Sequence, residues 1–478
     1  FGKLGIFAWL QSVSLMLPWL LVFGLAAAGI MVNLAVILVL LVISTAVYIV
    51  LGSQVRSLKQ EAALSKRASA IADSQEKTET SASADTPTPE ETTASKPAAE
   101  LASPEPEVVP IPAEDLKAIQ GIFGIDTFFA TETIPYQEGA IFRGNLRGDP
   151  EEAYAKLSAS LTERLGDRYR MFLVENQDGK PVIIVLPSSR DPQPMPLPQK
   201  GLALILLVVT ILSCLESAGL MLGFDLYTTP NRFSETFPLA AGIIAILAVH
   251  EIGHWVIASR HKVRLSLPFF IPTLQIGSFG AITRFESILP NRNVLFDVAF
   301  AGPAAGGLLS LGMLFTGLIL SHKGSFFQLP SQFFQGSILV GTLARVVLQE
   351  SLQEPIVDVH PLVVLGWLGL VITALNLLPA GQLDGGRIVQ AIYGRKTASR
   401  TTVGTLIVLG LAILVNPLAL YWALLILFLQ RDLERPSLNE LTEPDDARAA
   451  LGLLALFLMI VTLLPLTPSL AGRLGIGM

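Results

Sequence analysis

The stretch Pro238–Ile257, PLAAGIIAILAVHEIGHWVI, decides how this sequence is interpreted. Its length matches the about 20 apolar residues that a membrane-spanning helix needs. Its only ionisable side chains are His250, Glu251 and His254. Ionisable groups at bilayer depth are costly and usually mark a functional site. The stretch therefore predicts a spanning helix that carries a site with two imidazoles and one carboxylate.

The five residues HEIGH at positions 250–254 indicate what kind of site this is. Residues at i and i+4 lie on one face of a helix, about 6 Å apart at Cβ. That spacing lets both imidazoles bind one zinc ion, while the intervening glutamate serves as a general base. The pattern also recurs by chance in soluble chains. Here, however, a purely structural helix gains nothing from three titratable groups. We therefore predict that His250 and His254 bind Zn²⁺ and that Glu251 is catalytic.

A catalytic zinc site needs a third protein ligand and an open position for water. The residues after His254, SRHK at 259–262, offer no suitable carboxylate. The segment 376–387, NLLPAGQLDGGR, follows an apolar run and contains Asp384 between a Pro/Gly break and a diglycine. Glycines permit close approach of the backbone to a neighbour. Asp384 is the predicted third ligand, although an aspartate before a helix is also a common cap.

Composition supports a polytopic membrane protein. The chain has 478 residues, of which 51% are hydrophobic and 15% charged. That balance is too apolar for an ordinary soluble protein. The net charge is -6, and no basic tract indicates a nucleic-acid partner. The single cysteine, Cys214, excludes an intramolecular disulfide and a cysteine-rich zinc module.

Four segments differ in character along the chain. Residues 1–52 are apolar and predict N-terminal transmembrane segments. Residues 53–115 lack aromatic side chains, are rich in Ala, Ser, Thr, Glu and Pro, and predict a disordered acidic linker. Residues 116–195 predict a small soluble α+β domain. Residues 196–478 return to apolar runs and contain the predicted metal site.

The α+β prediction depends on two periodicities. Strands are expected over Ala140–Arg147, Met171–Glu175 and Pro181–Leu186, with a turn at residues 178–179. A helix is expected over Glu151–Leu165, because apolar residues recur there at helical spacing. This segment contains no histidine or cysteine, so it predicts no chemistry of its own.

The apolar runs predict a polytopic α-helical fold with about 7–9 spans. Beyond the N-terminal segment, the credible spans are Gly201–Phe224, Pro238–Ala258, Val294–Leu320, His360–Leu378 and Ala449–Leu464. Thr402–Gln430 is either one kinked helix or a tight hairpin, because Asn416-Pro417 interrupts it. Phe269–Phe285 contains too much Pro and Gly for a helix, so we expect a re-entrant or edge-strand element beside the site.

Lysine and arginine placement predicts the orientation in the membrane. Basic residues gather at Arg56–Arg67, Lys200, Arg260–Arg264 and Arg395–Arg400. All of them reach the cytoplasmic or stromal side if Gly201–Phe224 runs outward and the next span runs back. The soluble domain is expected on that same side, and the histidine pair near the inner end of its helix.

Several motifs together carry a family resemblance. The second motif, NxxPxxxLDG, is matched by Asn376, Pro379, Leu383, Asp384 and Gly385. Ala301-Gly302-Pro303 lies between it and HEIGH, and Gly144-Asn145-Leu146-Arg147 and 277–283, GSFGAIT, add two further matches. The chain resembles the site-2 proteases, the intramembrane zinc metalloproteases of peptidase family M50. More narrowly, it resembles their plant and cyanobacterial branch, the ethylene-dependent gravitropism-deficient and yellow-green proteins. It departs from the wider family at Gly306, where an asparagine often follows the AGP element.

The resemblance implies a protease that hydrolyses peptide bonds within or near transmembrane helices. Its substrate would be another membrane protein, such as an anti-sigma factor or a membrane-tethered regulator. The membrane would be a cyanobacterial cell or thylakoid membrane, or a plastid membrane. Asn376 would stabilise the oxyanion or hold the substrate strand, or else make a helix-terminus hydrogen bond. An unwound substrate segment could pair with a strand edge near Phe269–Ile282.

Two alternative functions use the same residues differently. A proton-coupled transporter would also place carboxylates in broken membrane helices, but it predicts internal repeats, and the sequence shows none. A catalytically inactive membrane scaffold could keep a metal for structural reasons. Structural zinc usually has four protein ligands, whereas the sequence offers three.

Overall fold

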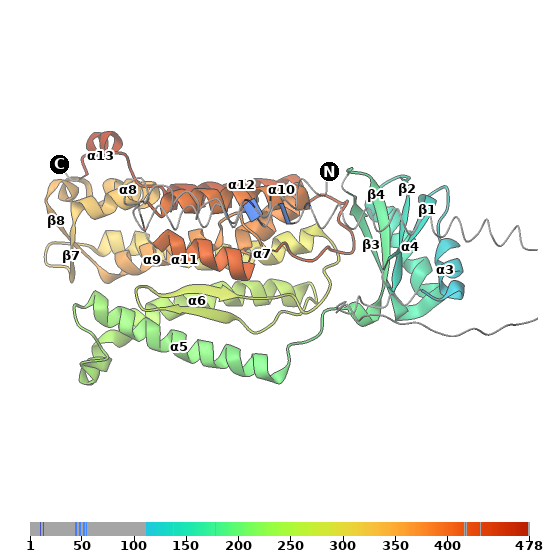
Figure 1. Cartoon of the computed structure of the whole chain (residues 1–478). Helices are drawn as coiled ribbons and strands as arrows, with labels where there is room; N and C mark the ends of the chain where they lie inside the picture. The colour runs from blue at the N-terminus through green and yellow to red at the C-terminus, as the bar shows by residue number, and fades with distance from the viewer. Residues whose placement is uncertain are drawn as a thin grey trace, which may run out of the picture. The chain divides into compact units, whose positions relative to one another are not determined.

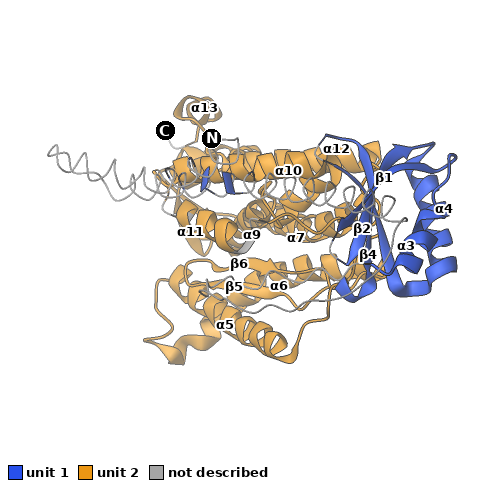
Figure 2. Ribbon diagram, turned by 45° about the vertical axis from the view of Figure 1, so that its right-hand side comes forward, with its two compact units in different colours: residues 1–190 blue, residues 191–478 orange. Residues whose placement is uncertain are grey.

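The fold was analysed in a computed structural model that describes residues 111–476, except 137, 177, 415, 417 and 431, and a few isolated positions between 10 and 54. The predicted spans in residues 1–52 and nearly all of the predicted linker therefore lie outside the described residues. The chain divides into two compact units, residues 1–190 and 191–478 (Figure 2).

The described part of the first unit is a four-stranded antiparallel sheet with two helices. The strand order is β1-β2-β4-β3 (Figure 1). The elements are α3 Ala113–Gln120, β1 Phe128–Tyr136, β2 Gly139–Leu146, α4 Pro150–Leu165, β3 Tyr169–Glu175 and β4 Pro181–Pro187. The three predicted strands and the predicted helix are all present, with their ends shifted by one or two residues. The turn between β3 and β4 includes Gly179 at a φ of 76°.

Helix α4 shows why this segment folds as predicted. The side chain of Asp149 accepts hydrogen bonds from the backbone N–H groups of Glu151 and Glu152, which caps the helix. Proline at the first helical position costs nothing, because its N–H would have no intrahelical partner. The buried positions recur at i and i+4, and they are Ala153, Leu157, Leu161 and Leu165. This apolar stripe packs the helix on the sheet side.

Helix α3 and strand β1 were not predicted. The linker was expected to end at residue 115, but α3 begins at Ala113 and its Asp115 is buried. Two nitrogens of Arg168 and the hydroxyl of Tyr169 donate to the Asp115 carboxylate at 2.8–3.0 Å. Burial and the hydrogen bond to Asp115 raise the pKa of Tyr169 to about 12. In the sequence, Asp115 looked like the end of the acidic linker, because the residues that bind its carboxylate lie more than 50 positions further along the chain.

The GNLR motif has a structural position in this sheet. Gly144 lies in β2, opposite Ala130 of β1. A Cβ at Gly144 would overlap the carbonyl of Phe129. The glycine therefore lets the two strands approach next to an irregularity in β1.

The second unit contains four helices that are long and apolar enough to cross a membrane. They are α5 Leu197–Met221, α6 Phe233–Arg260, α7 Arg292–Leu320 and α12 Asp446–Leu463. Each overlaps a predicted span, and α5 and α12 end three residues and one residue before the expected ends. The fifth predicted span is the shorter apolar helix α9, Pro361–Asn376. The expected total of 7–9 spans stays a prediction.

The remaining elements of this unit are short or interrupted. They are the hairpin β5 Phe269–Thr273 and β6 Gly277–Ile282, the pair β7 Phe327–Pro330 and β8 Ile356–Val359, and the helices α8 Ile338–Leu348, α10 Asp384–Ala412, α11 Leu418–Leu425 and α13 Pro468–Leu474. The hairpin β5–β6 is the expected strand element in Phe269–Phe285. Within Thr402–Gln430, α10 ends at Ala412 and α11 begins at Leu418. Helix α5 begins at Leu197, four residues before the expected start of its span at Gly201.

Glycines allow α7 to lie close to its neighbours α6 and α9 (Figure 1). A Cβ at Gly253 of α6 would come within 2.6 Å of the carbonyl oxygen of Ala301 in α7. A Cβ at Gly366 of α9 would overlap the backbone of Leu314 in α7. Small residues at such contacts are how membrane helices pack without a hydrophobic driving force. This close packing of α6 against α7 positions the site described below.

The contacts of Asp115 yield a testable prediction about the first unit. Replacing Asp115 with Asn removes the charge that Arg168 binds and should lower the local opening free energy by about 2 kcal/mol. Amides of α3 and β3 should then exchange about 30-fold faster with deuterium in the full-length protein. Hydrogen–deuterium exchange measured by mass spectrometry tests this. The exposed Asp126→Asn is the matched control, and equal protection in both variants would refute the assigned role.

Candidate metal centre

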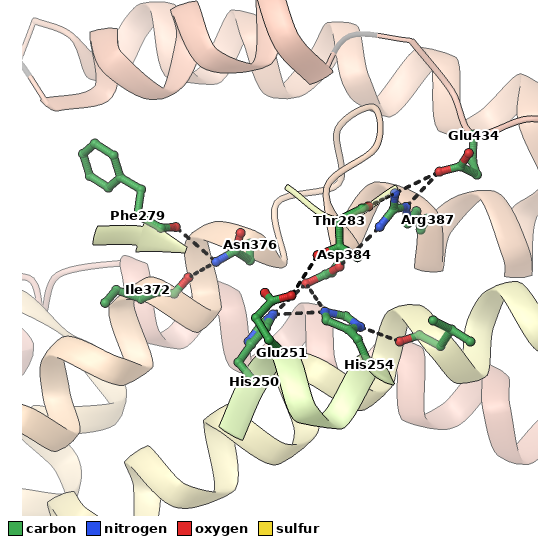
Figure 3. A network of polar contacts seen from close by, with 11 residues as sticks. His250, Glu251, His254, Phe279, Thr283, Ile372, Asn376, Asp384, Arg387 and Glu434 are labelled. Atoms are coloured by element: carbon green, nitrogen blue, oxygen red, sulfur yellow. Dashed lines mark hydrogen bonds and ion pairs between the residues drawn. The ribbon is translucent and has the colours of Figure 1, made fainter. Parts of the chain in front are cut away.

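Three side chains from two helices meet in the second unit (Figure 3). His250 and His254 come from α6, and Asp384 is the first residue of α10. Oδ2 of Asp384 lies 3.1 Å from Nε2 of His250 and 3.4 Å from Nε2 of His254. The two Nε2 atoms are 3.2 Å apart. All three residues are buried. The structure thus brings together the three residues that the sequence predicts as metal ligands.

A backbone carbonyl determines which nitrogen of His254 faces the cluster. Nδ1 of His254 lies 2.7 Å from the carbonyl oxygen of Val298 in α7. That carbonyl can only accept, so Nδ1 carries the proton and Nε2 presents a lone pair. Metal-binding histidines typically use their second nitrogen in this way.

Helix α7 makes room for both imidazoles with glycines. A Cβ at Gly302 would overlap the His254 imidazole, and a Cβ at Gly306 would lie 3.1 Å from Cβ of His250. Gly302 belongs to the AGP element. Gly306 is the position at which, as noted above, the sequence departs from the wider family that it resembles. The physical role of Gly306 in this chain is close packing behind His250.

The segment between α9 and α10 places Asp384. Gly381 adopts a φ of 49°, and its N–H donates to the hydroxyl of Thr402 at 2.8 Å. A Cβ at Gly385 would overlap the carbonyl of Leu377 at the end of α9. The two glycines therefore allow the chain to turn sharply and fold back, so that the first residue of α10 points at the histidines.

The cluster fits a metal ion on its own chemistry. Two imidazole nitrogens and one carboxylate oxygen form a donor set that zinc accepts, and three protein ligands are typical of a catalytic site. Within the described part of the chain, this is the group of His, Cys, Asp and Glu side chains able to hold a metal. The Nε2 lone pair of His254 faces a carboxylate oxygen of Asp384 at 3.4 Å, and a cation bound between the two acceptors removes their repulsion.

Glu251 stands beside the ligands and is not one of them. Its Oε2 accepts a hydrogen bond from Oγ1 of Thr283 at 2.8 Å (Figure 3). Thr283 directly follows strand β6. Glu251 is half-buried, and the hydrogen bond from Thr283 engages one of its two carboxylate oxygens.

Asn376 ends α9 and ties it to the hairpin. Its Nδ2 donates to the carbonyl of Ile372, one turn back in α9, at 2.9 Å and to the carbonyl of Phe279 in β6 at 3.3 Å. Both amide hydrogens are therefore used. These contacts support the alternative that Asn376 makes a hydrogen bond at the end of its helix, and they show that it also holds β6. Its role in binding the oxyanion stays a prediction.

A second polar group behind the ligands was not predicted from the sequence. Arg387 and Glu434 are both buried, and Nη2 of Arg387 lies 2.9 Å from Oε2 of Glu434. Arg387 could have been singled out from the sequence, because it is a charged residue directly after the diglycine in an apolar region. No local pattern marks Glu434. Asp297 of α7 lies outside the cluster and accepts hydrogen bonds from Arg448 of α12 at 2.7 Å and 2.9 Å, which is an interhelical contact.

A small cavity of about 10 Å³ adjoins the cluster and is lined by residues that include His254, Thr283 and Asp384. A larger cavity of about 460 Å³ is lined mainly by polar residues and by none of the three clustered side chains. Gln382 contributes to both linings, so the larger cavity lies on the far side of the residue that precedes Leu383 and Asp384.

The glycine at 302 gives a test of this geometry. Gly302→Ala should push His254 away from Asp384 and weaken zinc binding at least about tenfold, as loss of ligand orientation does elsewhere. Gly312→Ala is the matched control, because it lies in the same helix with open space around its Cβ. Competition with a zinc chelator measures both affinities. Equal affinities would contradict the described packing.

Comparisons with known proteins agree with this site. Residues 238–416 match the sequence model of peptidase family M50, and residues 117–194 match that of the EGY3 middle domain. "Probable zinc metalloprotease EGY1, chloroplastic" of Arabidopsis thaliana is 40% identical over 403 residues, which cover 76% of this chain and 73% of that protein. No solved structure gives a significant match.

Two further relatives from the same plant match at a similar level. "Probable zinc metalloprotease EGY2, chloroplastic" is 40% identical over 367 residues, covering 74% of this chain and 65% of that protein. "Probable zinc metallopeptidase EGY3, chloroplastic" is 34% identical over 381 residues, covering 74% and 66%. With a metal-binding cluster inside the matched region, the chain belongs to the EGY zinc metalloproteases of peptidase family M50.

Proposed function

We propose that this zinc metalloprotease cleaves its substrates inside the membrane, within or near their transmembrane helices. One observation carries the proposal. His250 and His254 lie on a helix that is long and apolar enough to cross a membrane, and the same helix carries Glu251. A hydrolytic site in that place acts on peptide bonds that a soluble protease does not reach.

The residues of the chain have distinct roles in the reaction. His250, His254 and Asp384 hold the metal. Zinc, when bound there, lowers the pKa of a water molecule to about 7 and polarises the scissile carbonyl. Glu251 accepts the water proton on its free carboxylate oxygen and delivers it to the leaving amine. Asn376 holds β6 beside the site, and its predicted contribution to oxyanion binding is secondary.

The hairpin β5–β6 is the proposed binding place for an unwound substrate segment. A helix hides its peptide bonds in internal hydrogen bonds, so it must unwind before cleavage. Ala281, Ile282 and Thr283 line the small cavity beside Asp384. An extended segment that pairs with this end of β6 would have its backbone next to the metal ligands.

Two other functions fit the structure less well. A transporter does not need three metal ligands around a shared point with a glutamate beside them. A structural metal usually has a fourth protein ligand, and the described residues offer three. Substrates of the proposed protease are membrane-anchored proteins, with anti-sigma factors and membrane-tethered regulators as candidates.

The proposed location is a plastid, thylakoid or cyanobacterial membrane. The relatives named above are chloroplastic. The excess of basic residues beside the predicted spans supports a cytoplasmic or stromal position for the soluble domain.

Removing the general base tests the proposed chemistry. Glu251→Gln should lower kcat by about 10²- to 10⁴-fold, because proton transfer is lost while the shape of the side chain is kept. A single-span reporter protein, reconstituted with the protease in lipid vesicles, serves as substrate. Zinc content should not change. Undiminished cleavage by a zinc-loaded Glu251→Gln protein would disprove the assignment. Peptides retained by this variant would also identify natural substrates.

Removing the third ligand tests the metal site. Asp384→Ala should weaken zinc affinity by about 100-fold or more and abolish cleavage. Asp297→Ala is a control of similar chemistry outside the ligand set. Zinc is measured by mass spectrometry after dialysis against a chelator. Retention of zinc at wild-type affinity would rule out Asp384 as a ligand.

Backbone pairing along β6 is tested separately. Ile282→Pro removes an N–H and should raise KM at least about tenfold, with zinc content unchanged. Ile282→Val keeps the strand and controls for the loss of side-chain volume. An unaltered KM in the proline variant would exclude capture along this strand.

A further inference from the structure

The carboxylate of Glu251 has a defined partner outside the ligand set. The hydroxyl of Thr283 donates to Oε2 of Glu251 at 2.8 Å. A general base needs one oxygen aimed at the water and therefore must not rotate freely. A hydrogen bond to Oε2 holds the carboxylate in one orientation. Thr283 itself lies on the connection after β6, so something must fix that connection.

Arg387 fixes it from the opposite side. Its Nη2 donates to the backbone carbonyl of Thr283 at 2.8 Å (Figure 3). Arg387 lies one turn after Asp384 in α10, and its Nη1 is 4.0 Å from Oδ1 of that ligand. One guanidinium therefore links the helix that supplies the third ligand to the residue that holds the general base.

Glu434 holds Arg387 in turn. Oε2 of Glu434 accepts from Nε of Arg387 at 3.1 Å and lies 2.9 Å from its Nη2. Glu434 is secured by Gln390, which exchanges hydrogen bonds of 3.0 Å and 3.2 Å with its backbone. The Phe285 ring lies 4.9 Å from the guanidinium carbon. A buried charge pair is expensive unless its hydrogen bonds are satisfied, as they are here.

We infer that Thr283 and Arg387 are positioning residues for the proposed hydrolysis. Thr283 orients the carboxylate of Glu251. Arg387 is held by its ion pair with Glu434 and sets the distance between Thr283 and Asp384. This inference rests on the proposed function, because it assigns these residues to the same general base. Arg387 acts through Thr283 and Thr283 acts through Glu251, and neither residue belongs to the metal-binding cluster.

The inference predicts a specific pattern of kinetic change. Thr283→Val keeps the shape of the side chain but removes the donor, so kcat should fall about 10- to 100-fold with KM and zinc content unchanged. Thr283→Ser keeps a hydroxyl and should recover most of the activity. A residue with only a structural role would not distinguish Ser from Val in this way.

Arg387 is tested by a conservative change. Arg387→Lys keeps the charge but cannot donate in a planar fork to both Glu434 and the Thr283 carbonyl, so kcat should fall about tenfold. Combining it with Thr283→Val should cost much less than the product of the two single effects, since both act through Glu251. Independent, multiplying effects would overturn the inference for Arg387.

Controls separate this inference from the proposed function. Thr462→Val removes a buried hydroxyl that donates only to Leu458 within α12, and it should leave kcat at the wild-type value. All variants are assayed with the same reconstituted single-span reporter, and zinc content and thermal stability report folding. If Glu251→Gln is inactive but Thr283→Val retains wild-type kcat, the inference fails and the proposed function stands. If Glu251→Gln remains active, the general-base assignment fails and this inference fails with it. If the zinc-loaded wild-type protein does not cleave the reporter, the proposed function itself fails.

Discussion

The contact between His254 and the Val298 carbonyl links the metal centre directly to the packing of α6 against α7. It selects the nitrogen of His254 that faces the ligands. It also requires α6 and α7 to lie close enough for a side-chain nitrogen of one to reach the backbone of the other. Glycines at 253, 302 and 306 make that distance possible. Packing and chemistry therefore depend on the same few positions, and a side chain added to this contact would disturb both.

Two polar networks share the interior beside this contact. One consists of the metal ligands on α6 and α10. The other runs from Glu251 through Thr283 and Arg387 to Glu434. Both networks include residues of the first turn of α10. The turn before Asp384 therefore positions Asp384 itself and also Arg387, which holds Thr283 next to Glu251. Polar groups buried in an apolar bundle are stable only when each finds its partners, which explains why these networks are continuous.

Much of the second unit was predictable because its signals are local. An apolar run of sufficient length predicts a helix, and α5, α6, α7 and α12 all overlap predicted spans. For the same reason, the HEIGH spacing predicted two of the three residues that meet in the cluster. Prediction was weakest where partners are distant in sequence. Asp115 was assigned to a linker because Arg168 and Tyr169 lie far along the chain, and Glu434 has no local pattern at all.

The sequence by itself determined the type of site: two histidines and a glutamate in an apolar helix leave few uses other than metal-assisted hydrolysis. It also pointed to Asp384, since the Pro/Gly break and the diglycine are visible without coordinates. Tertiary structure alone decided how these groups are held. The tautomer of His254, the engaged amide of Asn376 and the partner of Glu251 depend on contacts between residues 32 to 97 positions apart. Such contacts are fixed by helix packing, which no local sequence pattern records.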